Sequence, residues 1–158
     1  MNSSTSRVLF VCIDNTILSR LAEALLVAAG RGRYAVTSAG FTAAPADGAV
    51  IDALAQVGLQ LHNTSAQQTV DEHFVAGASF DYVVFLSVND DLHDLECPLF
   101  AGELRRLTWR LPAPLVEPGN AADDLASACA LRDAIQMRIN TWLSARYSIR
   151  PLPGERSS

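Results

Sequence analysis

Cys12 stands where an apolar run meets a polar turn, a position that can support nucleophilic chemistry. The run at residues 8–12 is followed by three polar residues at 14–16, and Ser19 then opens a helical pattern. Free N–H groups at a helix N-terminus form a natural anion site and favour a thiolate over a thiol. Cys12 is therefore a candidate nucleophile facing a phosphate or another oxyanion, although a cysteine within an apolar strand is also typical of a core position.

Alternating strand and helix patterns would hold this cysteine in place. Short β-prone runs predict strands, and apolar residues at helical spacing that end at glycine predict helices. We expect a single α/β domain with a parallel four-stranded sheet flanked by helices on both faces. Ligands of such sheets collect at the carboxyl ends of the strands, where the turn after Cys12 lies. The predicted strands are 8–12, 34–38, 80–86 and one within 104–111 around Thr108; the predicted helices are 19–29, 48–57, 69–76 and 122–146.

Length and charge limit the possible classes of protein. The chain has 158 residues, of which 49% are hydrophobic, which suits one domain with its own core. We expect a flexible N-terminus at 1–6, the domain at 7–147 and a loose tail at 148–158. The net charge of −5, from 12 basic and 17 acidic residues, argues against nucleic-acid binding.

No targeting or membrane segment is predicted. The apolar run at residues 8–13 is only as long as a strand, too short for a membrane span or a signal peptide. Three cysteines are too few for a secreted disulfide framework, and an odd number leaves one cysteine without a partner. These features favour a cytoplasmic protein without a membrane partner.

The segment around Cys12 resembles the opening motif of the low-molecular-weight tyrosine phosphatases and arsenate reductases. That motif reads in essence Val-Cys-x-Gly-Asn-x-Cys-Arg-Ser-x-x-Ala-Glu, and the resemblance needs no gap. It implies that Cys12 is the nucleophile, that Ser19 assists the sulfur and that Asn15 braces the loop. The matching residues are Val11, Cys12, Asn15, Ser19, Ala22 and Glu23, and the rest of the anion loop is Ile13, Asp14, Thr16, Ile17 and Leu18.

Later segments extend this resemblance from about residue 7 to residue 146. Residues 38–40, Ser-Ala-Gly, resemble the next motif of the family. Residues 80–86 and 97–102 are similar to the arsenate reductase branch, and residues 109–114 align with the loop Trp-x-x-x-Asp-Pro.

Four positions depart from the family pattern, and one of them, Ile17 in place of the second cysteine of the motif, removes a thiol. Leu18 replaces the arginine that clamps the oxyanion in a bidentate fork, and Ala113 replaces the aspartic acid that protonates the leaving group. Asp14 replaces a glycine; a like-charge pair about 5 Å apart costs on the order of 3 kcal/mol at an effective dielectric of 20. Asp14 can adopt the left-handed backbone of a glycine, so the loop shape can persist while phosphate affinity falls and the pKa of Cys12 rises.

Two residues are possible substitutes for the missing groups. Arg20 could replace the clamp, but it lies two helical positions beyond Leu18, about 200° round the helix, and is expected to point away from the loop. Glu117 could replace the acid, although a solvated loop charge is the more usual role of such a residue.

The remaining cysteines bear on redox chemistry. By family position, Cys97 is a possible resolving thiol for Cys12, whereas Cys129 lies on the apolar stripe of the last helix and is expected in the core. His93 and Cys97 are four residues apart, but two ligands do not make a metal site, and no metal or cofactor is predicted.

Three functional hypotheses follow. The first is a catalytically impaired family member that binds an oxyanion or a phosphorylated small-molecule or protein ligand weakly. The second is an active cysteine-dependent phosphatase or arsenate reductase that uses Cys12. The third is a protein-interaction module whose loop has become apolar through Ile13, Ile17 and Leu18. The sequence gives no indication of the oligomeric state.

Overall fold

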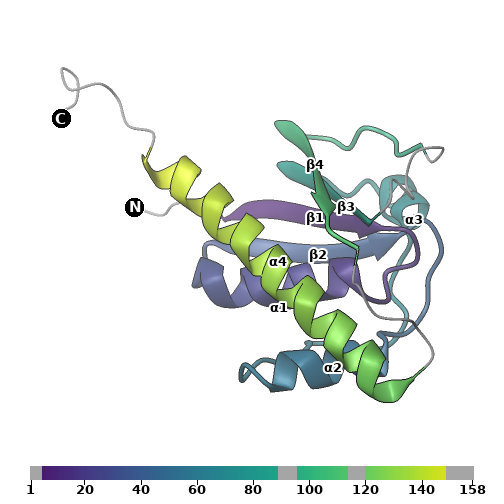
Figure 1. Ribbon diagram of the computed structural model, residues 1–158. Coiled ribbons are helices and arrows are strands. Elements are labelled where there is room, and N and C mark those ends of the chain that lie inside the picture. Colours follow the sequence, from purple (N-terminus) through teal and green to yellow (C-terminus); the bar gives the residue numbers. More distant parts are fainter. Residues whose placement is uncertain (1–4, 89–95, 114–119, 149–158) are drawn as a thin grey trace.

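The computed structural model describes residues 5–88, 96–113 and 120–148, which fold into one α/β domain (Figure 1). Strands and helices alternate as the sequence predicts, so the predicted fold class is confirmed. In chain order the elements are β1 (Ser6–Cys12), α1 (Leu18–Gly30), β2 (Tyr34–Gly40), α2 (Gly48–Ala55), α3 (Val70–Val75), β3 (Tyr82–Val88), β4 (Arg105–Leu111) and α4 (Ala121–Ser148).

In the described part of the chain, a four-stranded parallel sheet has the order β2-β1-β3-β4. β1 is a central strand, and its residues 8–11 are fully buried, as expected for a strand covered on both faces. Its last residue, Cys12, pairs with Gly40, the last residue of β2. The cysteine therefore lies at the carboxyl edge of the sheet, where the first crossover to a helix begins.

Side chains on the two faces of β1 belong to two different hydrophobic clusters. Val8 and Phe10 face the side covered by α1, α2 and α4, where the larger cluster forms. Leu9 and Val11 face the opposite side, where Val70 of α3 covers them together with aromatic residues of neighbouring segments (Figure 1). This alternation has the period of two residues that a strand imposes. Burying each large apolar side chain contributes about 1.5–3 kcal/mol, so the core fixes β1 and with it Cys12.

α4 corrects one prediction. Cys129 is only half-buried, and its Sγ donates a hydrogen bond to Oε1 of Gln56 at 3.2 Å, so its predicted core position is wrong. The buried residue at this turn is Ala128, one position before Cys129, whereas Ile135 and Ile139 of the predicted stripe are buried as expected. The buried residues of α4 are Ala128, Leu131, Ile135 and Ile139.

The ends of the domain fall partly outside the described residues. Ser6 is already the first residue of β1, and residues 1–4 and 149–158 lie outside the described part. The flexible segments at 1–6 and 148–158 therefore stay predictions. None of the helices in the described residues is both long and apolar enough to cross a membrane.

Candidate active site

The loop between β1 and α1 is tied to its neighbours through its backbone. The carbonyl of Ile13 accepts hydrogen bonds from the N–H groups of Phe41 (2.7 Å) and Thr42 (3.2 Å). The carbonyl of Thr16 accepts one from Asp47, the N-cap of α2, at 3.0 Å. Segments beyond β2 therefore hold both arms of the loop.

Asn15, not Asp14, takes the left-handed backbone in this loop, with φ of 59°. Asparagine tolerates this conformation better than most residues, because its short polar side chain can bond locally. Asp14 does not use the left-handed conformation that its residue type allows. The side chain of Asp14 instead closes the turn: its Oδ1 accepts hydrogen bonds from the N–H (3.2 Å) and the hydroxyl (2.8 Å) of Thr16.

Gly40 is packed against the loop backbone. A Cβ at this position would lie 2.6 Å from the carbonyl oxygen of Thr42, 2.7 Å from the carbonyl carbon of Asp14 and 2.8 Å from the nitrogen of Asn15. Because backbone atoms cannot yield as side-chain ends do, only glycine fits here. The Ser-Ala-Gly segment at 38–40 thus shapes the loop through close contact.

Cys12, Ser19 and Asn15 form one hydrogen-bonded chain. The hydroxyl of Ser19 lies 2.8 Å from Sγ of Cys12 and 2.5 Å from Oδ1 of Asn15, and all three residues are buried. Between Ser19 and Cys12 either group can be the donor: a neutral thiol can donate to the hydroxyl, and the hydroxyl can donate to a thiolate. The arrangement therefore places Ser19 where it can bond to either form of Cys12. The amide Nδ2 of Asn15 is buried without a hydrogen-bond partner in the described part of the chain.

Burial has the largest effect on the pKa of Cys12. Burial raises the pKa of the thiol above its ordinary value, and the charge of Asp14 raises it further. A hydrogen bond from the hydroxyl of Ser19 to the ionised sulfur and the N–H groups of Ser19 and Asn15 act in the opposite direction, but burial dominates. Backbone N–H groups of the loop therefore still act on the sulfur. Without a nearby cation they do not offset the effect of burial, and the thiol stays favoured over the thiolate.

We expect alkylation of Cys12 by iodoacetamide to rise with pH to a midpoint above that of free N-acetylcysteine. The direction follows from the raised pKa, because the thiolate is the reacting form and is depleted at neutral pH. Peptide mass spectrometry would follow this site separately from Cys97 and Cys129, and Ser19→Ala should move the midpoint higher. A midpoint at or below that of free cysteine would show that the loop activates the thiol.

Arg20 supports the loop through hydrogen bonds to backbone carbonyls. It is fully buried, and four of its N–H groups bond to backbone carbonyls. Nε donates to Asn15 at 2.7 Å, within the loop itself. The other carbonyls belong to Ala44 (3.1 Å), Asn63 (2.7 Å) and Ser65 (2.6 Å). Its guanidinium therefore holds together segments that are far apart in the sequence.

Glu23, on the same helix, is a half-buried charged residue that contacts β2. Its Oε1 accepts a hydrogen bond from the hydroxyl of Ser38 at 2.6 Å. Burial raises the pKa of this carboxyl group, while Ser38, Arg20 and His62 partly oppose the rise. The matched glutamate of the motif thus links α1 to β2.

A pocket of about 360 Å³ opens over the cysteine. Leu18 lies in its wall at the position of the family arginine, and Asp14 and Thr16 supply polar groups. Most of the wall is apolar and comes from three separate parts of the chain. The lining residues are Cys12, Ile13, Asp14, Thr16, Ile17, Leu18, Val88 and Leu131. The sequence reasoning missed Val88 and Leu131, since nothing local in β3 or α4 signals that they meet this loop.

Cys97 is not among the residues that line this pocket. It packs with the cluster on the α3 side of the sheet, whereas Cys12 belongs to the cluster on the opposite side. Burial raises the pKa of Cys97, and the charge of Arg106, whose Nη2 lies 3.7 Å from the sulfur, opposes this. The described residues therefore do not bring the two thiols together, and the resolving role of Cys97 stays a prediction.

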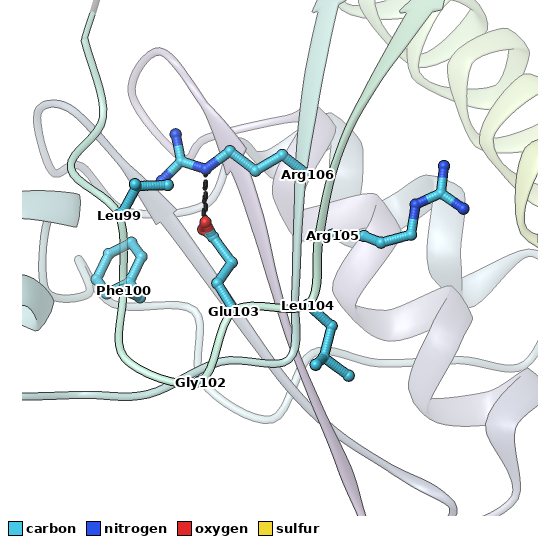
Figure 2. A pocket seen from close by; sticks show the side chains of 7 residues that line it. All are labelled: Leu99, Phe100, Gly102, Glu103, Leu104, Arg105 and Arg106. Atoms are coloured by element: carbon cyan, nitrogen blue, oxygen red, sulfur yellow. Dashed lines mark hydrogen bonds and ion pairs between the residues drawn. The ribbon is translucent and has the colours of Figure 1, made fainter.

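Arg106 organises the surroundings of Cys97. Its Nε donates to both carboxylate oxygens of Glu103, at 2.7 and 2.8 Å, and its Nη1 and Nη2 bond to the carbonyls of Cys97 and Pro98. Figure 2 shows this ion pair among the residues that line a second pocket of about 550 Å³, with the side chain of Arg105 pointing away from the ion pair. Nothing in the local sequence predicts this cluster beyond the resemblance of residues 97–102 to the arsenate reductase branch.

Some of the other predicted site residues lie within the described part of the chain and some lie outside it. Ala113 is exposed, two residues after the end of β4. Glu117 and His93 lie outside the described residues. Within the described ranges, no three His, Cys, Asp or Glu side chains lie together where they could hold a metal ion.

A central parallel strand that ends in a cysteine, followed by an anion-type loop and a helix, defines a cysteine-loop α/β protein of the phosphatase kind. The sequence profile described as low molecular weight phosphotyrosine protein phosphatase matches residues 7–106. The chain belongs to this family. The resemblance seen in the sequence is thereby confirmed.

Solved structures agree with the family assignment. The thioredoxin-dependent arsenate reductase of Corynebacterium glutamicum is 24% identical with a TM-score of 0.62; the match covers 94% of this chain but only 66% of that one. An arsenate reductase of Archaeoglobus fulgidus is 27% identical with a TM-score of 0.57, covering 84% of this chain and 98% of that one. The Drosophila arginine phosphatase is 21% identical with a TM-score of 0.65, covering 90% and 99%. No curated protein sequence matches the chain.

Proposed function

We propose that this chain is a catalytically impaired member of its family, a protein that keeps the loop and the thiol but does not turn over phosphate esters or arsenate at a useful rate. The observation that carries this proposal is the pocket over Cys12. In the described residues, its lining contains one carboxylate and no arginine, lysine or histidine. An oxyanion entering it would meet Asp14 in place of a guanidinium.

The lost groups belong to different steps of the reaction. An arginine at position 18 would bind the transferring group and stabilise its charge, and its loss costs about 10²- to 10³-fold in rate. A general acid at position 113 would protonate the leaving group, and its loss costs about 10²- to 10⁴-fold. The raised pKa of Cys12 reduces the fraction of nucleophile as well.

The position of Arg20 supports the same reading. Its N–H groups are donated to carbonyls of the loop and of residues 44, 63 and 65. Turning it toward the pocket would break these hydrogen bonds, of which the one to Asn15 is buried and the others are part-buried. A hydrogen bond from a charged donor is worth about 1.5–3 kcal/mol. We therefore assign Arg20 a structural role in place of the predicted one as a substitute clamp.

Two alternatives have their own support. The chain Cys12–Ser19–Asn15 favours an active enzyme, because a hydroxyl next to the sulfur can assist a thiolate. The apolar wall formed by Ile13, Ile17 and Leu18 favours an interaction module or a binder of an apolar ligand. We also propose a cytoplasmic location, since the three cysteines are unpaired.

Turnover of p-nitrophenyl phosphate tests the proposal. We expect the wild type and Cys12→Ser to hydrolyse it at the same rate, within about twofold, because the thiol contributes little without a clamp and an acid. Both proteins should show the same circular dichroism spectrum. A wild-type rate on the order of 100-fold or more above that of Cys12→Ser would overturn the proposal and favour the active enzyme.

A further inference from the structure

The pocket over Cys12 lacks the arginine that would bind an anion, because Leu18 stands in its place. Its shape and charge point to a different ligand. We propose that it binds a small organic cation with an apolar body, an alkylammonium or arylammonium ion. This inference rests on the proposed function, because it concerns the same pocket after the loss of the clamp.

The size and the wall of the pocket suit the apolar part of such a ligand. Its volume of about 360 Å³ lies within the range of small-molecule sites. Ile17 and Leu18 from the loop, Val88 from β3 and Leu131 from α4 line it on different sides. An aliphatic chain or one aromatic ring would leave water by filling this space.

Asp14 supplies the charge that selects the cation. It is the only ionisable group other than Cys12 among the described residues that line the pocket. Its Oδ1 is held by the N–H and hydroxyl of Thr16, so the carboxylate is fixed in place before a ligand arrives. Its Oδ2 has no hydrogen-bond partner in the described part of the chain.

The other classes of ligand fit less well. An anion would gain the N–H groups of Ser19 and Asn15, which act on the Cys12 sulfur, and a helix N-terminus equivalent to about half a positive charge. The full negative charge of Asp14 outweighs that half charge. A neutral apolar ligand would cover the pocket while leaving Asp14 without a counter-ion, which penalises its binding.

Three probes of similar shape separate these classes: benzylamine, benzyl alcohol and benzylphosphonate. Amide chemical shifts of the ¹⁵N-labelled wild type at neutral pH would report binding at residues 13–18 and at Val88 and Leu131. We expect benzylamine to bind about fivefold to tenfold more tightly than benzyl alcohol, and benzylphosphonate to bind more weakly than either. Raising the salt concentration should weaken the amine alone.

Asp14→Asn and Asp52→Asn form a matched pair of variants. Asparagine at 14 keeps an oxygen for Thr16 while removing the charge, so the affinity for benzylamine should fall to that for benzyl alcohol. Asp52 is exposed on α2 and does not line the pocket, so Asp52→Asn should leave the preference unchanged. Tighter binding of the phosphonate, equal binding of all three probes, or no binding of any would overturn this inference. None of these outcomes bears on turnover of p-nitrophenyl phosphate, so the failure of the inference can be told from that of the proposed function.

Discussion

The triple variant Asp14→Gly, Leu18→Arg, Ala113→Asp is expected to hydrolyse p-nitrophenyl phosphate at least about 10³-fold faster than the wild type. Leu18 is buried in the pocket wall directly after the loop, so an arginine there would enter the space above the Cys12 sulfur. The aspartic acid at 113 would protonate the leaving group, and the glycine would remove a repelling charge. All three changes act on the same transition state.

The three changes should be strongly coupled. Each single variant still lacks at least one group that the transition state needs, so we expect none to exceed the wild type by more than about tenfold. Leu18→Lys in place of Leu18→Arg keeps the charge but loses the bidentate fork, and it should recover only part of the rate. Adding Cys12→Ser to the triple variant should abolish the gain.

Folding must be followed together with the rate. An arginine at 18 without a bound anion places a charge against an apolar wall, so thermal unfolding of the triple variant should improve when phosphate is added. A folded triple variant that stays inactive would contradict this prediction. It would mean that the pocket has diverged beyond positions 14, 18 and 113.

The elements that fix Cys12 could be predicted from local sequence. The run at 8–12 is apolar without interruption, as a central parallel strand must be, and β1 spans Ser6–Cys12. Residues 19–29 repeat apolar side chains at helical spacing, and α1 spans Leu18–Gly30. An uninterrupted apolar run predicts the strand, and a clear helical period predicts the helix. Together these two elements place the loop at the carboxyl edge of the sheet.

The contacts that shape the site could not be predicted in the same way. The carbonyls bound by Arg20 lie 24 to 45 residues beyond it in the chain, apart from that of Asn15. Helical geometry places a side chain on a face of its own helix but does not say which loops cross that face. Which loop residue takes the left-handed backbone could not be predicted, because both Asp and Asn tolerate it and only the loop contacts select Asn15.

Replacing Arg20 with methionine is expected to lower the free energy of unfolding by about 3–5 kcal/mol. The change keeps an unbranched apolar stem but removes the donors of four hydrogen bonds, one of them buried and three part-buried. Part of the loss is offset, because methionine does not carry the cost of burying a guanidinium. For a domain of this size the loss lowers Tm by on the order of 10 °C, measured by calorimetry or by circular dichroism.

Two further variants distinguish a structural role of Arg20 from a role in anion binding. Arg20→Lys keeps the charge but has three N–H donors on one atom, which cannot reach carbonyls on several sides, so it should lose most of the same stability. Arg105→Met makes the same chemical change at an exposed residue and should stay within about 0.5 kcal/mol of the wild type. If Arg20 were instead an anion clamp, Arg20→Met would leave Tm nearly unchanged without phosphate and abolish stabilisation by phosphate. If Arg20 has a structural role, the protein should lose much of its stability even when no anion is present. This result is expected from its bonds to the carbonyls of Asn15, Ala44, Asn63 and Ser65.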